Sequence, residues 1–271
     1  MLYAEHKPSK ALEQYVKCFY TLEHQSNVLI EDYAFATGCI EVMFTLRGSP
    51  WQVGSNGVFR NTSPVEMWGQ ILKPLAFRIP GPGKTFGIRF YPATASFLLN
   101  DDVNNFNDGV FDLAGITGGS ISELHAKLQD EVLVSQQISL VESYLLKRLE
   151  ERSKVVEKIT FVQRVMNEVT HKDFFDNIEN VAGWYGISSR YLQKVFVQQT
   201  GLSPKLYMKI NRFQNSLVML GKKGVSLTSV AYACGYFDQS HFIREFKSFT
   251  GVSPSLFLPE NSTAILASPN K

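Results

Sequence analysis

Polar side chains that can read nucleic-acid bases recur in two stretches of the C-terminal third of the chain. They stand three or four residues apart, a spacing that places them on one face of a helix. The first face carries Arg190, Gln193, Lys194 and Val197, and the second carries Gln239, Ser240, His241, Arg244 and Lys247. Arginine and lysine donate to guanine, glutamine binds adenine through two hydrogen bonds, and neither set includes an acidic residue that would repel phosphates. These faces predict DNA binding; the alternative is two solvated helix faces.

An internal duplication surrounds these faces. Residues 181–207 align with residues 230–257, first at an offset of 49 and then, after one extra residue in the second copy, at an offset of 50. Both copies contain Val-Ala, a glycine four residues later, a phenylalanine, Thr-Gly and Ser-Pro, in that order. Self-similarity of this kind predicts two copies of one structural unit.

Each copy is expected to fold as a helix, a tight turn and a second helix. Gly186 and Gly235 allow the left-handed backbone of the turn, and Ser188 or Ser189 in the first copy and Asp238 in the second are suited to cap the next helix. Five apolar residues are expected to be buried on the second helices: Leu192, Phe196, Phe242, Phe246 and Phe249. This is the arrangement that enters a major groove.

A helix over residues 204–220 is expected to join the two units. Ser203-Pro204 marks its start, because proline is well suited to the first turn of a helix. A rigid connector would let the two recognition helices enter successive major grooves about 34 Å apart. One chain could then read a bipartite site.

Composition describes an ordinary globular protein with 44% hydrophobic and 19% charged residues. The net charge is only +2, but from Phe161 onward 12 Lys and Arg face 7 Asp and Glu, whereas residues 1–160 hold 15 against 18. This asymmetry fits a basic DNA-binding module joined to a different domain. No signal peptide or membrane-spanning run is recognised, so a cytoplasmic location and no membrane contact are expected.

Catalytic and metal-binding motifs are not found. The sequence has no Gly-rich phosphate loop, no G-x-S-x-G and no H-E-x-x-H. Cys18, Cys39 and Cys234 are scattered and have no Cys or His partners at ligand spacing. We therefore expect no metal, no cofactor and no enzymatic activity. The rival from another class is an N-terminal domain that transfers alkyl groups to cysteine.

The N-terminal part is predicted to be rich in β-strands. Residues 41–46 and 85–90 alternate apolar and polar side chains, and Gly and Pro clusters separate such stretches. The alternation points Arg89 away from Phe86, Ile88 and Phe90, so Arg89 is expected to lie outside the core if those three line it. A small antiparallel barrel or sandwich is the expected fold.

Helical periodicity follows the strands. Five apolar residues form one stripe at steps of three or four: Val134, Ile138, Val141, Leu145 and Leu149. The stripe is expected to pack on the chain's own barrel, with a dimer partner as the alternative. The charge-dense stretch 147–158 then marks the boundary. We expect a β-rich regulatory, effector-binding or dimerisation domain over residues 1–155, a DNA-binding domain over 156–260, and a flexible tail over 261–271.

The C-terminal residues resemble the DNA-binding domain of the AraC/XylS transcription regulators, over about residues 159–259. The stretch 229–242, S-V-A-Y-A-C-G-Y-F-D-Q-S-H-F, and the later T-G-V-S-P at 250–254 match that family's signature almost throughout. The resemblance implies an α+β multidomain protein. It would combine a cupin-like N-terminal β-barrel or sandwich and flanking helices with an all-α C-terminal domain of about seven helices and two helix-turn-helix units.

The resemblance also implies roles for individual residues. Base contacts are expected from Arg190, Gln193, Lys194, Gln239, His241 and Arg244. Phosphate contacts are expected from Ser189, Ser240 and Lys247. Arg212 matches an arginine of the connecting helix that we interpret as structural, while Ser216 replaces the family's usual alanine.

The predicted function is sequence-specific transcription regulation with double-stranded promoter DNA as the partner. Activation is the expected mode, with repression left open as the alternative. A small-molecule effector, RNA polymerase and a second copy of the chain remain open as further partners. No effector-binding residues can be assigned from the sequence. A purely partner-docking N-terminal domain is the third alternative.

Overall fold

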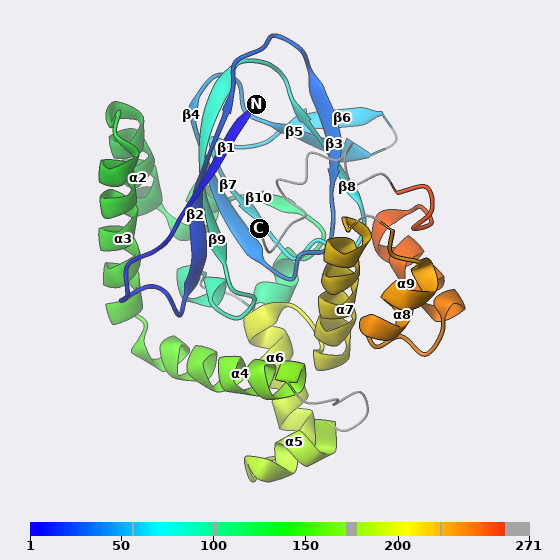
Figure 1. The fold of residues 1–271 in the computed structure, drawn as a ribbon. Coiled ribbons are helices and arrows are strands. Elements are labelled where there is room, and N and C mark those ends of the chain that lie inside the picture. Colours follow the sequence, from blue (N-terminus) through cyan, green and yellow to red (C-terminus); the bar gives the residue numbers. More distant parts are fainter. Residues whose placement is uncertain (56, 100–101, 172–177, 223, 258–271) are drawn as a thin grey trace.

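The computed structural model describes residues 1–271 except 56, 100–101, 172–177, 223 and 258–271. Its N-terminal part is a sandwich of two antiparallel sheets (Figure 1). The strands are β1 (Leu2–His6), β2 (Val16–His24), β3 (Ile30–Ala34), β4 (Ile40–Arg47), β5 (Gln52–Ser55), β6 (Val58–Asn61), β7 (Val65–Trp68), β8 (Leu75–Ile79), β9 (Gly83–Phe90) and β10 (Val110–Asp112). One sheet has the order β1-β2-β9-β4-β7-β10 and the other β3-β8-β5-β6. The predicted β-rich domain is confirmed, as two separate sheets.

Both faces of the six-stranded sheet are buried at its centre, around β4. On one face, Val42 and Phe44 of β4 belong to a core shared with the flanking helices. On the other, Met43 joins Trp51 and Phe77 of the four-stranded sheet. β4 therefore has buried positions on both of its faces, from Ile40 to Leu46, because a strand that is covered on both sides exposes few of its side chains to solvent.

Arg89 is buried, so the expectation that it lies outside the core is wrong. The alternation is right, since Arg89 points to the face opposite Phe86 and Phe90, but that face is covered and only 2% of the side chain is exposed. The guanidinium Nε donates to Glu41 Oε1 at 2.9 Å, and Nη1 lies 3.1 Å from Glu5 Oε1. The charge is thus neutralised within the chain.

Five short and long helical segments contribute to the core on one face of the six-stranded sheet. They are η1 (Ala95–Leu98), η2 (Val103–Phe106), α1 (Leu113–Thr117), α2 (Gly119–Asp130) and α3 (Val134–Glu150). From the predicted stripe on α3, Val141 and Leu145 are fully buried in the chain's own core, and Ile138 and Leu149 pack against it. The stripe therefore packs within the chain, as expected.

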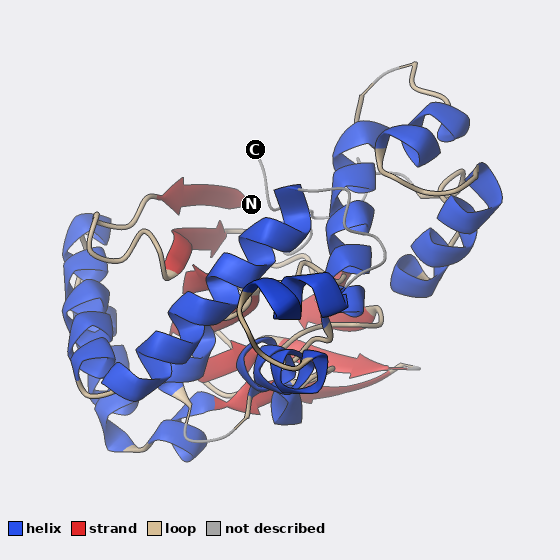
Figure 2. Cartoon of the chain, turned by 90° about the horizontal axis from the view of Figure 1, so that it is seen from below, coloured by secondary structure: helices blue, strands red, loops and turns tan. Residues whose placement is uncertain are grey.

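In the C-terminal part, all regular secondary structure of the described residues is helical, and turns connect the helices. Its six helices there are α4 (Ser153–His171), α5 (Ile178–Trp184), α6 (Ser189–Thr200), α7 (Pro204–Leu220), α8 (Leu227–Ala233) and α9 (Gln239–Thr250). Seen from below, helices lie on two opposite sides of the strands, and a long helix crosses in front of them (Figure 2). The predicted tail, residues 261–271, lies outside the described residues.

Helix α4 spans the proposed boundary at residue 155. Its first half contributes Ile159 to the core of the sandwich and its helices, whereas its second half contributes Val162 and Val165 to the helical core. Conversely, Phe35 and Ala93 of the β-rich part are members of the helical core. The two parts share a hydrophobic interface, and the division at residue 155 stays a proposal about the chain.

Candidate nucleic-acid interface

The first helix-turn-helix unit consists of α5, a turn and α6. Gly186 in the turn has a φ of +62°, the left-handed conformation that favours glycine. Ser188 caps α6: its side chain accepts from the backbone N–H of Tyr191 at 3.2 Å. Gly201 ends the helix at a φ of +74°. The glycine and the cap lie where the sequence predicts them.

Helix α6 buries one face and exposes the other. Leu192, Val195 and Phe196 are buried in the helical core. On the opposite side, Arg190, Gln193 and Lys194 are exposed, and Ser189 is half-buried. The structure therefore brings the three predicted base-contacting residues of this unit together on one accessible face.

The second unit repeats this arrangement with α8, a longer turn and α9. Gly235 has a φ of +75°, and Asp238 caps α9 by accepting from the backbone N–H of His241 at 2.6 Å. Phe242, Phe246 and Phe249 are buried. The extra residue of the second copy thus falls in the turn, which leaves the recognition helix intact.

The exposed face of α9 is narrower than the sequence predicts. Ser240, Arg244 and Lys247 are exposed, but Gln239 and His241 are half-buried. The Gln239 side chain accepts from Thr228 Oγ1 of α8 at 2.6 Å. These two residues face neighbours in the protein, and Arg244 is the remaining exposed residue among the three predicted to contact bases.

A buried carboxylate, Glu245, lies beneath this face, and sequence reasoning missed it. Arg212 of α7 donates to its Oε1 at 3.0 Å and to its Oε2 at 2.9 Å, and Lys209 Nζ and His241 Nε2 each lie 3.7 Å from Oε2. The structural role predicted for Arg212 is confirmed. Burial, with Glu245 nearby, raises the pKa of the Tyr236 hydroxyl. The available signal was the spacing, since Glu245 falls three residues after Phe242 on the buried face.

Helix α7 connects the two units and packs against both. Ser203 caps it by accepting from the backbone N–H of Leu206 at 3.2 Å. The Tyr207 ring lies 5.8 Å from that of Phe196 in α6, and the Phe213 ring lies 5.5 Å from that of Phe246 in α9. Aromatic contacts near the start and at the middle of α7 fix the two recognition helices to one connector.

The C-terminal end of α6 is attached to the β-rich part by polar contacts. Ser96 Oγ of η1 donates to Gln199 Oε1 at 2.8 Å, with both side chains buried. Asn107 Nδ2 donates to the carbonyl of Gly201 at 2.7 Å, and Gln198 Nε2 donates to Asp102 Oδ2 at 3.3 Å. The exposed polar face thus belongs to the N-terminal two thirds of α6, while its C-terminal end is anchored.

The three cysteines are free and buried. Burial raises the pKa of Cys18 to about 12 and that of Cys234 to about 11, and it also raises the pKa of Cys39. A raised pKa disfavours the thiolate that alkyl transfer needs. Within the described ranges, no group of three or more His, Cys, Asp and Glu side chains could hold a metal ion. In the same ranges, none of the helices combines the length and apolar character needed to cross a membrane.

Comparisons with known families match both parts of the chain. Residues 181–259 match the family described as a helix-turn-helix domain, and residues 4–112 match a domain of unknown function, DUF6597. The first match covers both units described above. The second covers the two sheets.

Curated relatives are transcription regulators. The chain is 28% identical over 141 residues to the HTH-type transcriptional activator RhaS of Klebsiella pneumoniae, covering 50% of this chain and 48% of RhaS. It is 28% identical over 124 residues to the Msm operon regulatory protein of Streptococcus mutans, covering 45% and 44%. The chain thus spans about half the length of these curated relatives.

Among solved structures, ToxT of Vibrio cholerae aligns with 88% of this chain and 96% of its own, at 12% identity and a TM-score of 0.47. The match to the helix-turn-helix family and the two relatives, RhaS and the Msm regulator, agree with the two capped units. The C-terminal part of this chain is a helix-turn-helix domain of the AraC type.

Proposed function

We propose that the protein is a sequence-specific DNA-binding transcription regulator. The observation that carries the proposal is the pair of capped recognition helices, α6 and α9, each with an exposed face bearing cations and both held by α7 (Figure 1). Two such helices on one connector suit successive major grooves about 34 Å apart. The curated relative RhaS is an activator, which supports activation as the mode of action.

We assign base contacts to Arg190, Gln193 and Lys194 in the first unit and to Arg244 in the second, because all four are exposed. Gln239 and His241 are assigned to bases on the condition that they exchange their present partners for DNA. Three further residues are assigned to phosphates: Ser189, Ser240 and Lys247. The second half-site would then be read chiefly by Arg244.

In this proposal the N-terminal domain, residues 1–155, modulates how the domain of residues 156–260 binds DNA. Support comes from Ser96 of η1 and from Asp102 and Asn107, the residues that flank η2. They hold the C-terminal end of α6 and the residue that follows it. An effector, a second copy of the chain or RNA polymerase would act through this contact. No catalytic step is included, because the buried cysteines are poorly suited to form thiolates.

Selection of bound duplexes from a random DNA pool by the full chain tests the proposal. We expect a bipartite site whose two halves are separated by one helical turn, about 10 base pairs. The Arg190→Ala/Arg244→Ala double variant is the control and should enrich the site poorly. Failure of the unaltered chain to bind any duplex at low salt, where phosphate contacts are strongest, would refute DNA binding. Recovery of unrelated sequences at physiological salt would refute sequence-specific recognition.

A further inference from the structure

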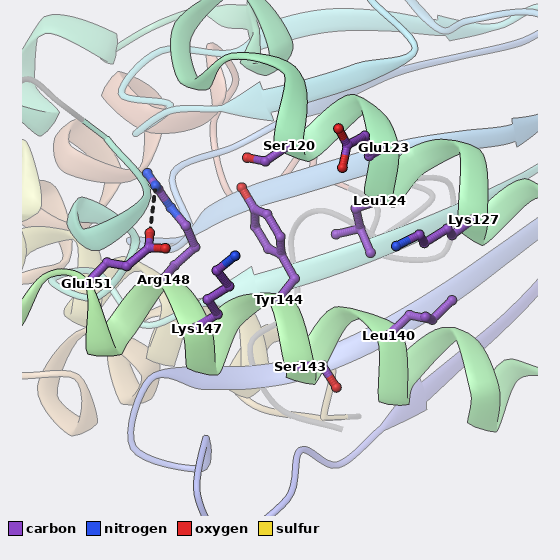
Figure 3. Close-up of a pocket in the computed structure, with 10 residues that line it drawn as sticks. All are labelled: Ser120, Glu123, Leu124, Lys127, Leu140, Ser143, Tyr144, Lys147, Arg148 and Glu151. Carbon is purple, nitrogen blue, oxygen red and sulfur yellow. Dashed lines mark hydrogen bonds and ion pairs between the residues drawn. The ribbon is translucent and has the colours of Figure 1, made fainter.

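The groove between α2 and α3 contains a cavity of about 430 Å³ on the side of the sandwich away from α8 and α9 (Figure 1). This volume lies in the range of sites for small molecules, about 300–1,000 Å³. Leu124 and Leu140 form apolar parts of its wall, and Tyr144 points from α3 toward α2 between them and Ser120 (Figure 3). The cavity could hold a compact apolar body.

Two buried donors at this cavity have no hydrogen-bond partner among the described residues: the Tyr144 hydroxyl and Arg148 Nε. The other guanidinium nitrogens of Arg148 are occupied, Nη1 by Glu151 Oε2 at 3.3 Å and Nη2 by the carbonyl of Leu98 at 3.4 Å. Buried donors are rarely left unpaired in folded proteins, and each such case calls for a missing partner. An acceptor in the cavity would supply it.

The charges around the cavity favour an anion. Lys127 and Lys147 are exposed at its rim, facing it from the two helices (Figure 3). Glu123 also lies at the rim, and the carboxylate of Glu151 is already paired with Arg148. Ammonium groups and N–H donors together are suited to a carboxylate, whose oxygens only accept hydrogen bonds.

We propose that the α2–α3 groove binds a small organic carboxylate with a compact apolar body. The carboxylate accepts from the Tyr144 hydroxyl and Arg148 Nε and is attracted by Lys127 and Lys147, while its body packs on Leu124 and Leu140.

Occupancy of this groove has a direct physical route to recognition helix α6. Arg148 donates to the carbonyl of Leu98 at the end of η1, and Arg152 Nη1 donates to the carbonyl of Leu99 at 3.1 Å. From the same short helix, Ser96 donates to Gln199 of α6 at 2.8 Å. A ligand that draws Arg148 toward the cavity would therefore pull on the element that anchors α6. This step rests on the proposed function; binding in the groove does not.

Calorimetric titration of the full chain without DNA tests the site, with 2-naphthoate as the probe and the neutral 2-naphthamide as its matched control. We expect naphthoate to bind and naphthamide to bind about tenfold more weakly, since only the anion gains charge-assisted hydrogen bonds. Tyr144→Phe and Lys147→Gln should each weaken naphthoate several-fold. Lys154→Gln, an exposed lysine outside the groove, should leave it unchanged.

Failure of naphthoate to bind at about 10 mM, equal binding of acid and amide, or indifference to Tyr144→Phe and Lys147→Gln would each overturn the site. The link to α6 is tested by measuring the Kd for the selected DNA site with and without naphthoate. Ser96→Ala should keep naphthoate binding but abolish its effect on the DNA Kd. Binding with no effect on DNA refutes the link alone. A chain that binds no DNA but still binds naphthoate refutes the proposed function and leaves the site standing.

Discussion

Arg212 on the connecting helix and Glu245 on the second recognition helix form a two-point ion pair, with N–O distances of 3.0 and 2.9 Å to the two carboxylate oxygens. Glu245 is only 4% exposed and Arg212 13%. The pair fixes α9 to α7 directly behind the face that carries Arg244, so it determines how the second unit is presented.

Removing one partner of this pair should destabilise the helical domain strongly. Arg212→Met leaves Glu245 buried beside only the more distant Lys209 and His241. The expected loss is about 3–5 kcal/mol in the free energy of unfolding, measured by urea denaturation. The double variant Arg212→Met/Glu245→Leu should recover much of it, because no charge is left unpaired.

The control for that experiment is the exposed pair of Arg78 and Glu31, whose side chains are 29% and 45% exposed. Arg78→Met should cost less than about 1 kcal/mol. A loss for Arg212→Met as small as that for Arg78→Met would show that the buried pair contributes little.

Base and phosphate contacts should respond differently to alanine substitution. Arg190→Ala and Arg244→Ala are expected to lose about 1–3 kcal/mol of specific binding and to relax discrimination at one base pair. Lys247→Ala should weaken binding to all sequences alike and reduce the salt slope by about one. Fluorescence anisotropy with cognate and scrambled duplexes measures both, with Lys10→Ala as a control distant in sequence. Equal losses on both duplexes for all three variants would reject the assignments.

The cap of α9 should contribute to the stability of the fold. Asp238→Ala leaves the first amide groups of α9 without their side-chain acceptor, because Asp238 Oδ1 now accepts from His241 N–H. The expected loss is about 0.5–2 kcal/mol in the free energy of unfolding, whereas Asp238→Asn should lose much less. If both variants melt at the same temperature, the cap is not the reason for the difference from wild type.

Glu66 should make the stability of the β sandwich depend on pH. It is 1% exposed, accepts from Trp68 Nε1 at 3.0 Å, and burial raises its pKa to about 7 from 4.5. Because the folded pKa is the higher one, the folded state holds a proton that the unfolded chain releases between about pH 4.5 and pH 7. Stability should therefore fall as the pH rises through this window, by about 3 kcal/mol from this group.

Urea denaturation of the wild type and Glu66→Gln at about pH 5 and about pH 8 measures this effect. The difference in unfolding free energy between the two proteins should change over this range, since glutamine does not titrate. Glu123→Gln, an exposed site, serves as the control and should track the wild type. A parallel pH profile for Glu66→Gln and wild type would contradict the prediction.

The helix-turn-helix units could be predicted because their determinants are local. A glycine with positive φ, an N-cap and an apolar face lie within a few residues of one another, and the duplication presents each of them twice. The β-rich fold could be predicted for the same reason, from the alternation of apolar and polar residues along single strands. Local patterns, in both cases, decide local backbone geometry.

The remaining features depend on contacts between distant residues. Alternation gives the face on which Arg89 lies but not whether a second sheet covers that face. Ser96 and Gln199 are 103 residues apart, and neither carries a local sign of the other. The α2–α3 groove depends on the spacing of two packed helices. The partial burial of His241 depends on its packing within the helical domain, where its Nε2 lies 3.7 Å from the carboxylate of Glu245.

Helix α4 has a consequence for how the protein melts. Ile159 belongs to one hydrophobic core and Val162, less than one turn later, to the other, while Phe35 from the sandwich completes the helical core. Unfolding of either half thus exposes apolar surface of the other half and removes apolar contacts that stabilise it. The chain should behave in calorimetry as one cooperative unit with a single transition, even though its two halves match separate families.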